Sequence, residues 1–175
     1  MTNTKNAMNF GAILGLSLCV VSAIFMSLGY FKSNFKDIVL SAITIAIISW
    51  GTISFRDHHN YGFINYGKAF TSCFLIVFYS SIIFGFFYYI YFNFFGHEIM
   101  EEMIEEAENK LFQDKLGEEE IEYNMRAVKY LITPIGLSIT SIISSLFMGA
   151  IFGLITAAFL KRDNPNFNNF IKENQ

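Results

Sequence analysis

Residues 69–96 read AFTSCFLIVFYSSIIFGFFYYIYFNFFG, a run of 28 residues without an Asp, Glu, Lys, Arg or His side chain. Three more runs of this kind cover residues 6–31, 38–55 and 130–160. The hydrocarbon core of a bilayer is about 30 Å thick and a helix rises about 1.5 Å per residue, so each run is long enough to cross it. All 12 basic and 15 acidic residues lie outside the four runs. This partition predicts a protein that crosses the membrane four times.

The four runs predict a helical rather than a barrel architecture. Barrel strands need segments of about ten residues that alternate between apolar and polar, and none of these runs alternates. We therefore expect an all-α membrane protein in which an extramembrane acidic helical hairpin joins the third and fourth transmembrane helices. The whole chain, 1–175, forms one four-helix membrane domain. Its expected parts are spans at about 8–30, 38–55, 69–91 and 134–160, an acidic helical connection at 97–129, and a flexible tail at 163–175.

The connection between the third and fourth spans is strongly acidic. Eleven of the 15 acidic residues of the chain lie between Glu98 and Glu122. Apolar residues recur there every three or four positions, which predicts an amphipathic helix with one apolar stripe. The stripe consists of Ile99, Met100, Met103, Ile104, Ala107, Leu111 and Phe112.

Capping residues predict how the helices of the connection begin and end. Gly117 is expected to end the first of them as a C-terminal cap, and a second helix is expected to begin at the following run of three glutamates. Glu122 lies four residues before Arg126, a favourable spacing for an ion pair on a helix. Thr133 and Pro134 are typical of a capping residue followed by a first-turn proline.

Small residues repeat every fourth position in the first and fourth spans. In lipid, close backbone approach at such residues is a main source of helix association. Two hypotheses follow: the small residues form an oligomer contact, or they pack the two spans within their own bundle. These helix-packing seams include Gly11, Gly15 and Ala23 in the first span and Ser145, Gly149, Gly153 and Ala157 in the fourth.

The composition argues against several classes of function. A net charge of −3 without a concentrated basic surface speaks against nucleic-acid binding. His97, Glu101 and Glu105 would share a helix face, but a catalytic metal site needs a further ligand in a pocket that excludes water. We therefore predict no catalytic residue, no cofactor and no metal. The exposed carboxylates instead form a candidate partner surface, with Glu98, Glu101, Glu102, Glu105, Glu118 and Glu119 as its residues.

Four segments of this chain resemble a known family. They are NFGAILG at residues 9–15, FRD at 55–57, GFINYGKAF at 62–70 and GLITAAFLKR at 153–162. Together with the acidic hairpin, they make the chain similar to the bacterial four-span membrane family known as domain of unknown function 4199. The resemblance extends over nearly the whole chain. It implies four spans and a bacterial envelope, and it supplies no catalytic residues.

These observations lead to an expected location and function. The 12 basic residues divide equally between the two sides of the membrane, and the density of Lys161 and Arg162 at the end of the fourth span favours both termini in the cytoplasm. Together with the bacterial envelope that the resemblance implies, the expected location is the bacterial cytoplasmic (inner) membrane, which the protein would cross several times. The leading hypothesis is a non-catalytic scaffold or partner subunit of an envelope complex, surrounded by membrane lipids. It would contact a second copy of itself or another membrane protein. The alternatives are a small oligomeric carrier or channel, and an accessory to a lipid-linked sugar enzyme.

Overall fold

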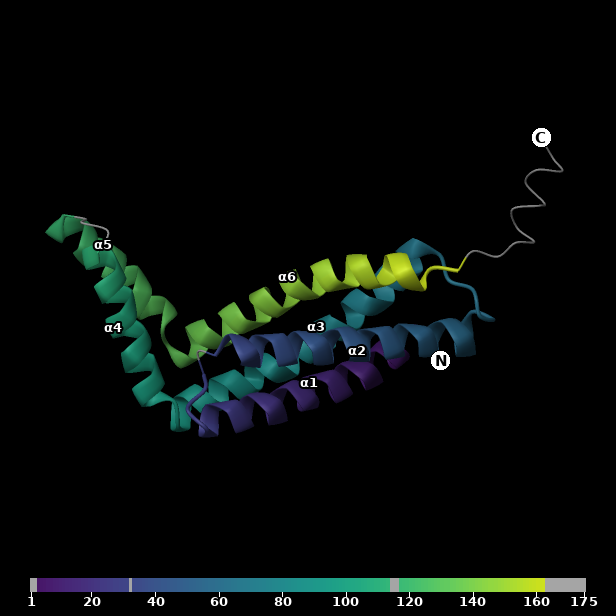
Figure 1. Cartoon of the computed structure of the whole chain (residues 1–175), viewed down its shortest axis with the longest axis horizontal. Coiled ribbons are helices and arrows are strands. Elements are labelled where there is room, and N and C mark those ends of the chain that lie inside the picture. Colours follow the sequence, from purple (N-terminus) through teal and green to yellow (C-terminus); the bar gives the residue numbers. More distant parts are fainter. Residues whose placement is uncertain (1–2, 32, 114–116, 163–175) are drawn as a thin grey trace. The chain divides into compact units, whose positions relative to one another are not determined.

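The computed structural model describes residues 3–31, 33–113 and 117–162. The expected all-α architecture is confirmed, since every regular element in the described residues is a helix (Figure 1). The predicted flexible tail, 163–175, lies outside the described residues. The helices are α1 (Asn3–Ser27), α2 (Asn34–His59), α3 (Tyr66–Phe94), α4 (His97–Gln113), α5 (Glu118–Leu131) and α6 (Pro134–Leu160).

Four of these helices, α1, α2, α3 and α6, are long and apolar enough to cross a membrane. The chain is therefore a multi-pass membrane protein. The end of helix α2 differs from the expected end of the second span. Arg56, Asp57, His58 and His59, which we expected in a polar turn, continue α2 by one more turn. A helix does not stop where its apolar residues stop, because polar side chains are tolerated in a helix once it leaves the hydrocarbon core.

Glycines with positive φ shape the two short turns. Gly29 (φ 74°) follows α1, and the amides of Gly29 and Tyr30 donate to the carbonyl groups of Met26 and Phe25, which is a Schellman ending. Gly62 (φ 80°) follows α2, where its amide donates to the Arg56 carbonyl. Both turns therefore reverse the chain within a few residues.

The chain divides into two compact units. The first, here called the bundle unit, comprises residues 1–83 and 144–175, and so contains α1, α2, the first part of α3 and the last part of α6. Figure 1 shows these segments running alongside one another. Asn6 Nδ2 of α1 donates to the Gly51 carbonyl of α2 (3.0 Å), and Thr52 of α2 contacts Cys73 Sγ of α3 (3.1 Å). These two contacts join three helices by buried polar groups.

The outward surface of the bundle unit is apolar. Leu16 and Val20 of α1 are 61% and 60% exposed, and Phe147 of α6 is 68% exposed. Large exposed apolar side chains are the normal surface of a helix that faces lipid, since lipid tails are as apolar as leucine. This surface fits the membrane assignment.

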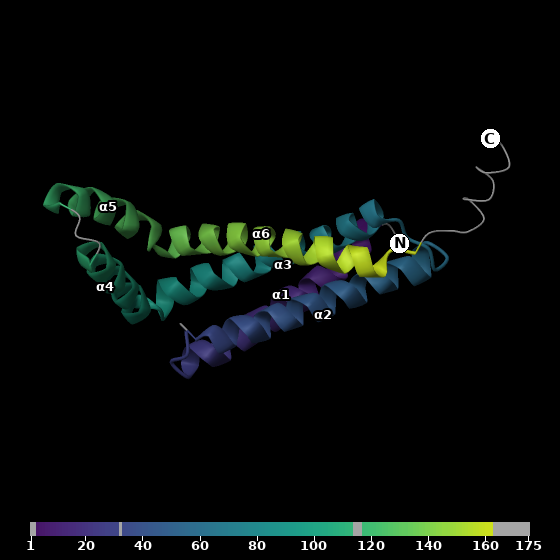
Figure 2. The ribbon, with the colours of Figure 1, turned by 45° about the horizontal axis from the view of Figure 1, so that its top comes forward.

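The second unit, residues 84–143, holds the end of α3, helices α4 and α5, and the start of α6. Ser138 Oγ donates to the Gly85 carbonyl (2.7 Å), which ties α6 to α3. Helices α4 and α5 lie side by side and form the expected hairpin (Figure 2). Thr133 is confirmed as the cap of α6, since its Oγ1 accepts from the Gly136 amide (3.0 Å).

The prediction for Gly117 is wrong. Instead of ending α4, Gly117 is the residue that precedes α5, with extended backbone (φ −65°, ψ 154°). Helix α4 ends at Gln113, four residues earlier. A C-terminal glycine cap needs a positive φ, and the three glutamates that follow Gly117 favour a helix N-terminus at that point.

Candidate functional site

The glycines of the first seam lie against α3. A methyl group at Gly11 would lie 2.7 Å from Tyr79 Cβ and 2.9 Å from the Ile76 carbonyl oxygen. At Gly15 it would lie 2.9 Å from Ile83 Cβ. The backbone of α1 lies so close to α3 at these two positions that no larger residue has room, so the two helices meet where only glycine fits.

The glycines of the second seam lie against the same helix. Gly149 of α6 faces the side chain of Val77, and a methyl group at Gly153 would lie 3.3 Å from Cys73 Cβ. Ala157, one turn further along, is fully buried. Helix α3 of the bundle unit therefore receives α1 and α6 on two of its faces. The glycine contacts of both seams lie within this chain.

Two seam residues are less enclosed. Ala23 of α1 and Ser145 of α6 are half-buried. A seam that repeats every four residues turns by about 40° per step around its helix, so a straight partner follows only part of it. The enclosed part is the start of the first seam, Gly11 and Gly15, and the later part of the second, from Gly149 to Ala157.

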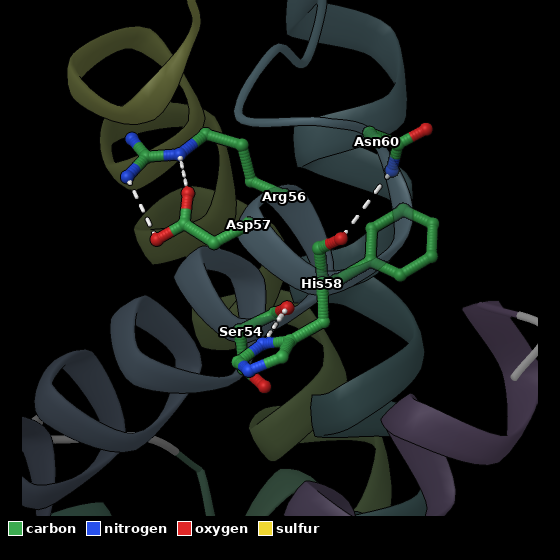
Figure 3. A network of polar contacts seen from close by, with 6 residues as sticks. Ser54, Arg56, Asp57, His58 and Asn60 are labelled. Carbon is green, nitrogen blue, oxygen red and sulfur yellow. Dashed lines mark hydrogen bonds and ion pairs between the residues drawn. The ribbon is translucent and has the colours of Figure 1, made fainter.

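Charged residues converge at the end of the bundle unit where α2 stops. The Arg56 side chain is 18% exposed, and its Nε and one Nη contact the two carboxylate oxygens of Asp57 at 2.7 and 3.3 Å (Figure 3). His58 Nδ1 lies 3.0 Å from the Ser54 carbonyl oxygen, which holds this ring along its own helix. The Asn60 amide group donates to the Phe55 carbonyl (3.5 Å) and closes the helix end.

A short backbone pairing joins the end of α6 to the α2–α3 turn. The amide of Ile64 donates to the Arg162 carbonyl (2.9 Å), and the amide of Arg162 donates to the Ile64 carbonyl (2.8 Å). Beneath it, Ile64 packs in a buried cluster with Phe55, Ala69 and Ala157. Three of the four segments that carry the family resemblance, 55–57, 62–70 and 153–162, thus meet at one end of the bundle unit.

The acidic hairpin presents its carboxylates to solvent. Helix α4 has no buried residue, and its apolar stripe is mostly half-buried, with Phe112 exposed. Ile121 and Met125 of α5 are buried. Glu98, Glu101, Glu102, Glu105 and Glu119 of the predicted partner surface are exposed, whereas the side chain of Glu118 lies outside the described residues.

Two ion pairs of the hairpin are internal to its helices. Lys110 Nζ lies 2.9 Å from Glu106, and Arg126 lies 2.6 Å from Glu122, which confirms the pair expected from spacing. No ion pair between described residues involves the exposed glutamates of α4. Those glutamates therefore form a negative surface. Neighbouring carboxylates on one helix repel one another, and an external cation that balances their charge would remove this repulsion.

No metal centre is present in the described part of the chain, where no three His, Cys, Asp or Glu side chains converge. Cys19 is half-buried in α1, Cys73 is buried in α3, and both are free thiols. Sequence reasoning missed the polar contacts of Asn6 and Thr52 that cross between helices. The one available signal was an asparagine inside a charge-free run.

Comparison with known proteins gives one match. A family model described as a protein of unknown function, DUF4199, matches residues 9–162. No curated protein and no solved structure matches the chain. The matched range takes in most of α1 and all of α2 to α6, so the chain belongs to this family.

Proposed function

We propose that this member of the family is a non-catalytic scaffold or partner subunit in the bacterial cytoplasmic membrane, and that it meets a basic partner through the α4–α5 hairpin. The exposed glutamates of the hairpin carry the proposal. Glu98, Glu101, Glu102 and Glu105 are exposed on α4 without an ion-pair partner among the described residues. A surface of one sign attracts a partner of the other sign and excludes partners of its own.

The packing of the seams supports the choice of the hairpin. Gly11, Gly15, Gly149 and Gly153 are in close contact with α3 of the same chain, so these positions are not open to a second protein. An exposed surface outside the membrane is then the better candidate for a contact. The partner is a membrane protein or a second copy with a basic extramembrane segment.

The carrier alternative receives less support. Three hydroxyl groups within the spans bond back to their own helix: Ser17, Thr44 and Ser49 donate to carbonyl groups four residues earlier at 2.6–2.8 Å. A hydroxyl used in this way has its only donor engaged and is left with acceptor capacity alone. The buried Ser22 and Ser72 hydroxyls have no hydrogen-bond partner in the structure and are the observation that favours a carrier. Substrate uptake that fails in a Ser22→Ala, Ser72→Ala variant and survives removal of the hairpin charges would establish it.

Crosslinking at the hairpin tests the leading proposal. A photoreactive residue at Glu101 or Glu105 is expected to give one reproducible crosslinked species in native membranes, whereas the same residue at the lipid-facing Leu16 gives none. Replacing Glu98, Glu102 and their exposed neighbours on α4 by glutamine should abolish the species, and added salt should weaken it. A crosslink that survives both treatments, or the lack of any crosslink, would refute a charge-based partner.

Sidedness is the second part of the proposal. The termini and the α2–α3 turn are placed in the cytoplasm, where positively charged residues near span ends are enriched. Tyr61, 95% exposed in the α2–α3 turn, and Glu105 in the hairpin are suitable for single-cysteine labelling after Cys19 and Cys73 are replaced. A membrane-impermeant thiol reagent applied to intact cells should label position 105 and not position 61. The reverse pattern would invert the topology and place the acidic surface among cytoplasmic partners.

A further inference from the structure

The end of the bundle unit where α2 stops is strongly basic. Helix α1 starts at this end, because Asn6 donates to the carbonyl of Gly51, five residues before Arg56 on α2. Among the described residues, Asp57 is the one carboxylate there. Five cations belong to the helix ends that meet here and are called the basic end: Lys5, Arg56, Lys68, Lys161 and Arg162.

One arginine of the basic end is paired with the carboxylate of Asp57, and a second arginine lies in its neighbourhood. Asp57 takes the Nε and one Nη of Arg56, and it also lies within electrostatic reach of Arg162. The backbone pairing with Ile64 fixes the position of Arg162 at this end, and the Arg162 side chain is exposed. No hydrogen bond between described residues engages the other Nη of Arg56. Two guanidinium groups and one carboxylate leave a net charge of +1 with free N–H donors.

Exposed aromatic residues of α2 and α3 suit a location of the basic end at the depth of lipid headgroups. Trp50 of α2 is 60% exposed, and Tyr66 at the start of α3 is 41% exposed. Exposed Trp and Tyr gather at the level of the headgroups, where an aromatic ring is partly in lipid and partly in water. The planar fork of a guanidinium matches the oxygens of a phosphate, and an anionic phospholipid presents that group at this depth.

We propose that the basic end binds the phosphate of an anionic phospholipid, with Arg56 and Arg162 as the two arms of the site and Asp57 as the group that orients Arg56. A phosphodiester carries one negative charge and balances the net +1 of the three side chains. Lys5, Lys68 and Lys161 supply a surrounding positive field. The lipid would reinforce the junction between α2, the α2–α3 turn and the end of α6.

Native mass spectrometry of the full chain, with phosphatidylglycerol and phosphatidylcholine of the same acyl chains, tests the assignment. We expect preferential binding of phosphatidylglycerol, reduced about fivefold in Arg162→Gln, since a cation near an anionic membrane surface contributes about 1 kcal/mol. Arg162→Gln should fold normally, because the pairing with Ile64 uses backbone atoms. Arg162→Lys should retain part of the preference, and Arg56→Gln with Arg162→Gln should lose about twenty-fivefold.

The matched control is Lys110→Gln with Arg126→Gln, which removes two cations from the hairpin and should leave the lipid preference unchanged. Equal binding of the two lipids, or an equal loss in the hairpin control, would overturn the proposal. Displacement of phosphatidylglycerol by excess inorganic phosphate would assign the site to free phosphate instead. Displacement by a short acidic peptide would assign it to a protein partner, and either result would overturn a lipid site.

Discussion

Helices α1 and α3 meet at glycine and backbone, whereas α4 and α5 lie side by side with Ile121 and Met125 of α5 buried. The first contact lies in a span, where lipid already surrounds every apolar group and burial alone stabilises little. The second lies in a charged, extramembrane segment, where removing apolar surface from water is the main source of stability. Helix association therefore comes from close packing where the helices are surrounded by lipid, and from burial of apolar surface where they are surrounded by water.

The largest effect is expected from filling the glycine contact of the bundle. Gly11→Leu should destabilise the protein by about 3 kcal/mol, because the added atoms meet the Tyr79 side chain and the immovable Ile76 carbonyl. The measurement is thermal unfolding in detergent, with Gly67→Leu as the control because nothing lies within 4 Å of a methyl group there. Equal effects of the two substitutions would show that close approach at Gly11 is unimportant.

The stability of the α4–α5 hairpin should fall when a buried side chain is made smaller. Ile121→Ala should destabilise the hairpin by about 2 kcal/mol, the lower end for a buried isoleucine, since 9% of the residue is already exposed. Hydrogen exchange should rise across α4 and α5 while α1 and α2 remain protected. Leu131→Ala, at a residue that is 56% exposed, is the control. Faster exchange in α1 would mean that the bundle unit depends on the hairpin core.

A smaller effect is expected from the polar contact that links α1 to α2. Asn6→Leu removes the donor of the Gly51 carbonyl and should cost about 1 kcal/mol, as hydrogen bonds between membrane helices do. Asn9→Leu makes the same chemical change at an exposed position of α1 and should be neutral. If reversible unfolding gives the two variants the same midpoint, the hydrogen bond contributes nothing beyond the glycine packing.

The sequence predicted the spans well because a bilayer excludes charge whatever the tertiary structure. It did not predict which helix receives the seams. Helix α3 meets Gly15 with Ile83 and Gly149 with Val77, and neither residue is part of a repeat of small residues. The surface of α3 that receives the glycines depends on the three-dimensional placement of large side chains. The residue pattern of one helix does not predict that placement. The extension of α2 through His59 was missed for the related reason that helix ends follow capping as well as polarity.

The smallest effect concerns the charged surface that distinguishes the hairpin from the bundle. Glu122 and Arg126 are both exposed, so their ion pair is screened and should contribute about 0.3 kcal/mol at low salt. A double-mutant cycle with Glu122→Gln and Arg126→Gln, followed by hydrogen exchange in α5, measures this coupling. The coupling should vanish at high salt, while the effect of Ile121→Ala persists because burial of apolar surface is not screened. Coupling above 1 kcal/mol, or coupling that resists salt, would mean that charge pairing rather than the two apolar residues holds α5 in place. The negative surface would then belong to the stability of the hairpin and not to its partner.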